Sequence, residues 1–242
     1  MYTLLLKEAL LDIEDDNKKS IKELAEYCRL QSDASEATIK KLEEGYGDHS
    51  PIWWYTGRYF IYSMLSYGLR LMKVEIILKM GFFIRHLHQD IQNLYDEQKA
   101  KNMIMDSPYK VYRGQGLSVQ DFEIMKKCQG QLMSFNNFLS TSLDRDVSLD
   151  FAQAALKDTD TVGILFHMII DPVICEELKI PFGDIDYEHT DRLWQVNLTL
   201  AGNDDHELNS LTAHLRDDAS WTTGWSRLGY ILIKLGESIK AK

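Results

Sequence analysis

Two short stretches decide the fold: YKVYRGQG at residues 109–116 and FNNFLSTS at residues 135–142. Residues 109–113 alternate in the manner of a strand, and Gly114 breaks the pattern. An arginine at the end of a strand can bind a diphosphate with its fork of donors, and a following glycine lets a ligand approach the backbone. Arg113 is therefore a candidate ligand-binding residue, with a buried structural arginine as the alternative.

The second stretch places small hydroxyl side chains beside aromatic rings. On a strand, Ser140 and Ser142 would face one way and Thr141 the other. With Phe135 and Phe138 nearby, these hydroxyls suit a ligand that carries a ring and a ribose. An ordinary strand or turn is the alternative for this stretch.

Further strands and helices follow without a regular alternation, which indicates an α+β fold. Residues 161–170 form a continuous apolar run and predict a buried strand. Residues 193–200 alternate apolar and polar side chains and predict a half-buried strand. Short helices are predicted at residues 120–128 and 147–156.

Helical patterns flank this central region on both sides. Residues 52–97 carry apolar side chains at three- and four-residue steps, and they predict two antiparallel helices. We therefore expect four segments in the chain. They are an N-terminal segment of unclear role at 1–51, a helical lobe at 52–105, a ligand-binding core at 106–203 and C-terminal helices at 204–242.

The last predicted helix, at residues 224–240, allows two interpretations. Trp225, Leu228 and Gly229 resemble the opening of a tetratricopeptide repeat, which would make the chain a helical scaffold that docks onto further repeats. Only half a repeat is present, so the alternative is a terminal helix that packs on the rest of the chain.

Taken in this order, Arg113-Gly114 and the stretch 138–142 resemble the first two elements of the Arg–Ser–Glu signature of mono-ADP-ribosyltransferases. This branch includes the arginine-specific enzymes and many bacterial toxins. The resemblance covers roughly residues 52–200, because the intervening helix and the strand 162–170 also come in the family's order. It implies an α+β fold with two small, roughly perpendicular β-sheets around an NAD cleft, an N-terminal helical lobe and C-terminal helices.

The resemblance also implies roles for individual residues. Arg113 would hold the NAD phosphate and ribose, and Gly114 would offer its backbone to the nicotinamide carboxamide. Ser140 would orient the catalytic glutamate, while Phe138 and residues 141–142 would complete the NAD-binding strand. The implied activity is transfer of ADP-ribose from NAD to an acceptor protein, classically at arginine, with release of nicotinamide and without a metal.

The third element of the signature departs from the family. The family carries Glu-x-Glu or Gln-x-Glu on a loop entering a strand, where the second glutamate stabilises positive charge as nicotinamide leaves. No such pair lies between Ile170 and Leu200, and about one loop and one strand are missing by comparison. The nearest substitute is the Asp-x-Glu at residues 186–188, so Glu188 is the candidate catalytic carboxylate. A solvated acidic turn is the alternative, and a catalytically impaired NAD-binding or protein-interaction module is the alternative function.

Composition narrows the partners further. The 242 residues carry a net charge of −10 with no basic patch, which argues against nucleic acid and anionic membranes as partners. The three cysteines, Cys28, Cys128 and Cys175, are far apart and lack a CxxC pair, so we expect reduced thiols in a cytoplasmic protein rather than disulfides or zinc. The N-terminus shows no secretory signal, and no apolar run is long enough to span a membrane.

Overall fold

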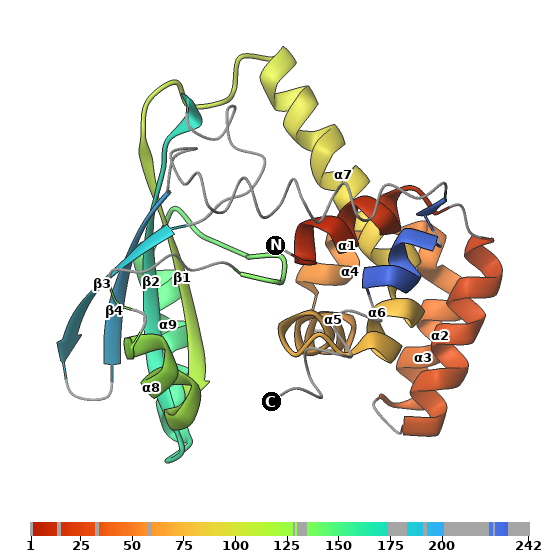
Figure 1. Cartoon of the computed structure of the whole chain (residues 1–242), viewed down its shortest axis with the longest axis horizontal. Helices are drawn as coiled ribbons and strands as arrows, with labels where there is room; N and C mark the ends of the chain where they lie inside the picture. Colours follow the sequence, from red (N-terminus) through yellow and green to blue (C-terminus); the bar gives the residue numbers. More distant parts are fainter. Residues whose placement is uncertain are drawn as a thin grey trace. The chain divides into compact units, whose positions relative to one another are not determined.

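The structure is a computed structural model that describes residues 2–13, 16–31, 34–57, 60–127, 129, 135–173, 183–190, 193–200, 223–224 and 226–231 (Figure 1). The chain is mixed helix and strand, as the sequence predicts, and it divides into two compact units. The helical unit comprises the described residues up to Met103 and those at 223–231. The sheet unit comprises the described residues from Ile104 to Leu200.

The helical unit contains seven α-helices and one 3-10 turn before residue 104, within the described ranges. They are α1 (Tyr2–Leu11), α2 (Asn17–Gln31), α3 (Glu36–Gly45), η1 (Tyr46–Asp48), α4 (Pro51–Thr56), α5 (Phe60–Arg70), α6 (Val74–Lys79) and α7 (Gly81–Ala100). Ser35 and Ser50 cap α3 and α4, each accepting a hydrogen bond from a backbone N–H three residues on. Trp54 is fully buried, so part of the aromatic cluster at residues 53–55 packs the core.

The two antiparallel helices predicted over residues 52–97 are in fact four, α4 to α7. The unexpected break after α5 falls at Met72, whose φ of 50° is left-handed. Lys73 N donates to Gly68 O at 2.8 Å across this turn, which is the six-residue bond of a Schellman ending. Glycine usually marks such an ending, and a methionine here gives no such signal.

The C-terminal segment packs on α1. Leu228 and Ile231 are buried, and Arg227 forms an ion pair with Asp12. A Cβ at Gly224 would come within 2.9 Å of Ala9 O, so this segment needs a glycine where it meets α1. These contacts favour the terminal packing helix. Trp225 and most of the segment 204–242, for which the sequence predicts C-terminal helices, lie outside the described residues, so the tetratricopeptide resemblance stays a prediction.

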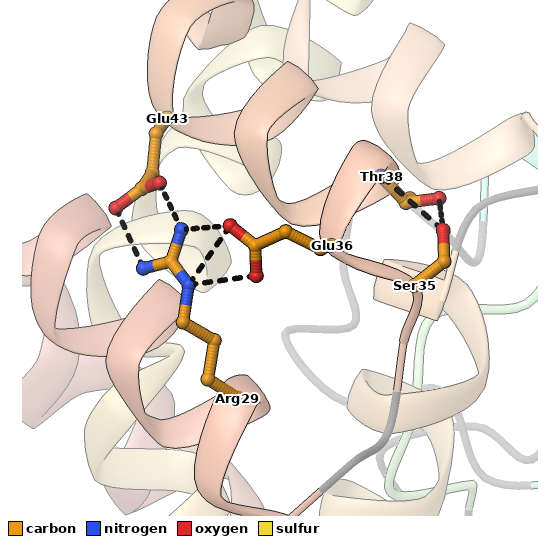
Figure 2. Close-up of polar contacts among 5 residues, drawn as sticks. All are labelled: Arg29, Ser35, Glu36, Thr38 and Glu43. Atoms are coloured by element: carbon orange, nitrogen blue, oxygen red, sulfur yellow. Dashed lines mark hydrogen bonds and ion pairs between the residues drawn. The ribbon is translucent and has the colours of Figure 1, made fainter.

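A three-residue ionic clamp ties α2 to α3 (Figure 2). Arg29 of α2 donates from Nε and Nη2 to both carboxylate oxygens of Glu36, at 3.0 and 2.9 Å, and from Nη1 to Glu43 at 3.1 Å. Hydrogen bonds from Arg29 hold the pKa of the Glu36 and Glu43 carboxyls below their usual 4.5. A bidentate arginine pair of this kind is the geometry in which an exposed ion pair contributes measurably.

We expect Arg29→Gln to lower the melting temperature by about 1–3 °C at pH 7, the scale for a well-formed exposed network in a chain of this size. Both carboxyl pKa values are depressed in the folded state, so the clamp stabilises above about pH 4.5 and its contribution disappears as the pH falls through the folded values. The difference between the thermal melts of wild type and variant should therefore shrink as the pH falls below about 4.5. Lys19→Gln, which removes the 4.0 Å contact to Glu23, is the control and should shift the melt less. A difference that persists unchanged at pH 3 would contradict this role.

The sheet unit is built on one four-stranded sheet (Figure 1). The strands are β1 (Tyr109–Ser118), β2 (Thr161–Ile170), β3 (Gly183–Thr190) and β4 (Leu193–Leu200), in the order β1-β2-β4-β3. β2 pairs antiparallel with β1 and parallel with β4, and β3 closes an antiparallel hairpin with β4. The predicted strands at 161–170 and 193–200 are confirmed. All four described strands lie in this one sheet, and a second, perpendicular sheet is not found among the described residues.

β3 is the strand that the sequence analysis missed. The acidic stretch at residues 184–191 was expected to be a turn or a loop ahead of the next strand, but residues 183–190 pair along the whole of β4. Its acids Asp184, Asp186 and Glu188 alternate with Ile185 and Tyr187, which is the period of a strand. The density of acids obscured that period.

The two faces of the sheet are packed differently. One face carries the apolar core, which the helix α8 (Val119–Lys127) joins through Phe122 and Met125. The buried strand residues of this core are Val111, Val162, Ile164, Phe166, Met168, Val196 and Leu198. The opposite face receives α9 (Arg145–Ala154), followed by the short turn η2 (Ala155–Lys157). Because successive residues of a strand face opposite sides of the sheet, Gly114 and Gly116 of β1 and Gly163 of β2 belong to that second face.

Candidate functional site

The helix α9 touches the backbone of β1 and β2 directly. A Cβ on Gly114 would lie 1.7 Å from Ser148 O, and one on Gly163 would lie 2.4 Å from Ala152 O. Both distances are far shorter than any real contact, so only glycine fits beneath the helix. In the structure, a glycine is needed at position 114 because α9 packs against it. The sequence suggested another reason, the close approach of a ligand.

Arg113 is a buried charge on β1, with 7% of its surface exposed. Its Nε donates to the side-chain oxygen of Gln115 at 3.0 Å, and its Nη1 donates to the backbone carbonyl of Ser140 at 3.0 Å. The latter bond joins residues 27 positions apart in the chain. The arginine and the Ser-Thr-Ser segment therefore lie in contact, and the guanidinium fixes the main chain of that segment.

Ser142 then ties the segment to β1 and leads into α9. Its backbone exchanges two hydrogen bonds of 2.8 Å with Tyr112, an isolated bridge at the edge of the sheet. Its hydroxyl accepts a hydrogen bond from Asp144 N at 3.0 Å, and the Asp144 carboxylate in turn accepts one from Asp146 N at 2.9 Å, capping α9. One short run of chain thus connects the guanidinium contact to the start of the helix.

The segment before Ser142 is not the strand that the sequence predicts. Residues 135–141 form no regular strand, and residues 130–134 lie outside the described residues. Ser140 and Thr141 are exposed, and it is the carbonyl of Ser140 that meets Arg113. Phe135 stacks edge-on against Phe166 with ring centroids 5.4 Å apart, so its ring belongs to the core. Phe138, three residues further along the chain, is half-buried.

The backbone register assigns Glu188 and Arg113 to different rows across the sheet. Glu188 pairs with Gln195, and this row continues through β2 to Gly114. Arg113 lies in the next row, which continues through β2 and β4 to Tyr187. Neighbouring rows belong to opposite faces of a sheet. The structure therefore brings Arg113 and Ser140 together. The backbone position of Glu188 is not in the same row as Arg113 but in the neighbouring one.

Sequence reasoning missed a polar group on the α9 side of the sheet. The rings of Tyr112 and His167 stack with centroids 5.1 Å apart, and His167 Nδ1 lies 3.1 Å from the side-chain oxygen of Asn197. Gln195 donates to the same oxygen at 3.2 Å. The available signal was one histidine inside the apolar run of residues 161–170, which breaks an otherwise continuous strand pattern.

Metal and membrane features are not found in the described part of the chain. No group of three or more histidine, cysteine, aspartate or glutamate residues there is arranged to hold a metal ion. Among the helices that the structure describes, none combines the length and the apolar character that a membrane crossing requires.

The unit with these contacts is a mixed sheet and helix domain with a buried arginine beside a hydroxyl-rich segment. No family model matches the chain, and no curated protein matches it. Its fold is similar to solved structures of the ADP-ribosyltransferase Vis toxin from Vibrio splendidus, at 13% identity and a TM-score of 0.41 over 81% of this chain and 91% of that one. The Vis complex with M6 inhibitor gives 12% and 0.42, and the complex with agmatine 13% and 0.41. TM-scores below 0.5 mark a distant likeness of chain path.

We expect Gly114→Ala to destabilise the sheet unit strongly, because the new methyl group would overlap the α9 backbone. Overpacking of this kind costs about 1–3 kcal/mol, and contact with main chain puts the cost at the upper end. Gly229→Ala is the control, because a Cβ there meets nothing within 4 Å. Urea unfolding followed by circular dichroism measures both. An equal midpoint for Gly114→Ala and wild type would show that α9 does not press on β1.

Proposed function

We propose that this chain has an ADP-ribosyltransferase-like core that binds NAD and transfers ADP-ribose to an arginine side chain of an acceptor protein, releasing nicotinamide. The observation that carries the proposal is the contact between the buried Arg113 guanidinium and the backbone of Ser140. It unites the two elements of the signature that the sequence retains. The proposal includes a second small sheet facing the first across the NAD cleft.

The chemistry of the retained residues fits a dinucleotide. A guanidinium binds a diphosphate oxygen with charge-assisted hydrogen bonds that are stronger than those it now makes to the neutral oxygens of Gln115 and Ser140. The exposed hydroxyls of Ser140 and Thr141 offer donors and acceptors to a ribose. In the reaction, the bond between the ribose and nicotinamide breaks, the acceptor nitrogen bonds to the same ribose carbon, and the acceptor loses a proton.

Turnover requires a carboxylate that stabilises positive charge on the ribose as nicotinamide leaves. Glu188 is the residue that we propose for this role. The second candidate function is a chain that does not catalyse the transfer. The sheet register favours it, because the row of Glu188 ends at Gly114 rather than at Arg113. In that case the chain is an NAD-binding or protein-interaction module.

NAD binding should depend on the fork of Arg113. We expect Arg113→Ala to weaken NAD at least about tenfold, the scale of a charged hydrogen bond, and Arg113→Lys to weaken it less, because lysine keeps the charge and loses the bidentate geometry. Calorimetric titration with NAD measures both, with the exposed Arg145→Ala as the matched control that should bind as wild type does. Circular dichroism of each variant checks that loss of the Ser140 contact leaves the fold intact.

No binding of NAD by the wild-type chain at millimolar concentration would overturn both candidate functions. Equal affinity of the wild type and a folded Arg113→Ala variant would instead leave NAD binding in place and remove Arg113 from the site. The arginine would then be a structural residue that holds the Ser140 backbone.

Release of nicotinamide separates the two candidates. If Glu188 is catalytic, Glu188→Gln should reduce the release rate by about 10²–10³ while NAD affinity stays nearly unchanged, because the charge is lost and the shape is kept. Asp184→Asn, an acid on the same strand, is the control and should retain the rate. A wild-type chain that releases no nicotinamide above buffer is the binding module. An active Glu188→Gln variant would assign the chemistry to another carboxylate.

A further inference from the structure

The outward face of α9 carries an apolar ridge. Val147 and Phe151 lie one helical turn apart on α9, with 47% and 65% of their surfaces exposed, and Leu143, 62% exposed, lies just before the N-cap Asp144. Side chains four apart lie on the same side of a helix, so Val147 and Phe151 form one strip of about 6 Å at 1.5 Å per residue. Isolated exposed apolar residues are ordinary, whereas a contiguous strip of large ones marks an interaction surface.

The ridge is not needed to hold α9 on the sheet. That contact is made by the other side of the helix, where Ser148 and Ala152 are buried and their backbone meets Gly114 and Gly163. Val147 and Phe151 stand next to these residues in sequence but point away from the glycines, as their exposure shows. A structural role in the sheet unit therefore does not account for them.

An acidic row runs along one edge of the ridge. Asp146 and Asp150, each one residue before a ridge residue and also four apart, are exposed. Within the part of the chain that the structure describes, neither forms an ion pair. Apolar side chains bordered by carboxylates favour an occupant that is apolar along its centre and basic along its edge.

We propose that the outward face of α9 is a docking surface for a basic amphipathic helix of another protein. The ridge formed by Val147 and Phe151 would pack into the apolar groove of that helix, and Asp146 and Asp150 would meet its lysine or arginine side chains. A second copy of this chain would oppose like charges along the same row, and an anionic lipid surface would be repelled by it. The proposal is independent of NAD binding.

The size of the ridge sets the strength of this interaction. A ridge of about one helical turn offers less than the surface that stable complexes bury, so the complex is transient, with a Kd on the order of micromolar or weaker. Charge steering contributes mainly to the rate of association and falls with added salt. Affinity should therefore depend on both the ridge and the ionic strength.

The test uses the full chain and a fluorescent helical peptide of about 18 residues with a leucine stripe and flanking lysines, long enough to form a helix when bound. A second peptide has the same stripe with glutamates in place of the lysines. Fluorescence anisotropy should show binding of the lysine peptide and at least tenfold weaker binding of the glutamate peptide. Phe151→Ser should weaken the lysine peptide about tenfold or more, and the double change Asp146→Asn with Asp150→Asn should remove most of its salt dependence.

The matched control is Ile124→Ser on α8, which removes another exposed apolar side chain, 56% exposed, and should leave binding unchanged. Val147→Ser repeats the test if Phe151→Ser does not fold as judged by circular dichroism. Equal binding of the two peptides, or unchanged binding in a folded Phe151→Ser variant, would overturn the proposal. Analytical ultracentrifugation that shows a dimer for the wild type and a monomer for Phe151→Ser would also overturn it, since the occupant of the surface would then be a second copy of this chain.

Discussion

The arrangement of the sheet unit depends on the contact between the α9 backbone and the glycines beneath it. Because Gly114 and Gly163 lack a Cβ, the helix rests on the main chain of β1 and β2. The residues that lead into α9 begin at Ser142. Its backbone pairs with Tyr112 of β1, and its hydroxyl accepts a hydrogen bond from Asp144 N. The contact with the glycines turns the other side of α9 outward. The position of α9 and its exposed side thus follow from two residues without side chains.

The strands with a clear apolar period could be predicted from the sequence, and those with a mixed signal could not. Residues 161–170 are an unbroken apolar run, and residues 193–200 alternate cleanly. In β3, by contrast, acids fill every second position from 184 to 188, and the pairing with β4 decides the conformation. The end of α5 at Met72 is set by a left-handed turn that no glycine announces.

The candidate site shows the same division. The residue types and order at 113–114 and 140–142 predict that these segments belong together, and Arg113 does contact Ser140. The atoms that meet could not be predicted, because the contact uses a backbone carbonyl and depends on a loop conformation rather than a strand. The position of Glu188 follows from the register of β3, which depends on pairing between segments that no local pattern fixes.

The central claim is that Arg113 exchanges a neutral acceptor for the diphosphate of NAD. A crystal structure of the chain with NAD tests this most directly. The account predicts a phosphate oxygen within hydrogen-bond distance of the Arg113 guanidinium and the nicotinamide ribose beside Ser140. NAD bound elsewhere, or absent from the structure at saturating concentration while Arg113 still donates to the Ser140 carbonyl, would contradict it.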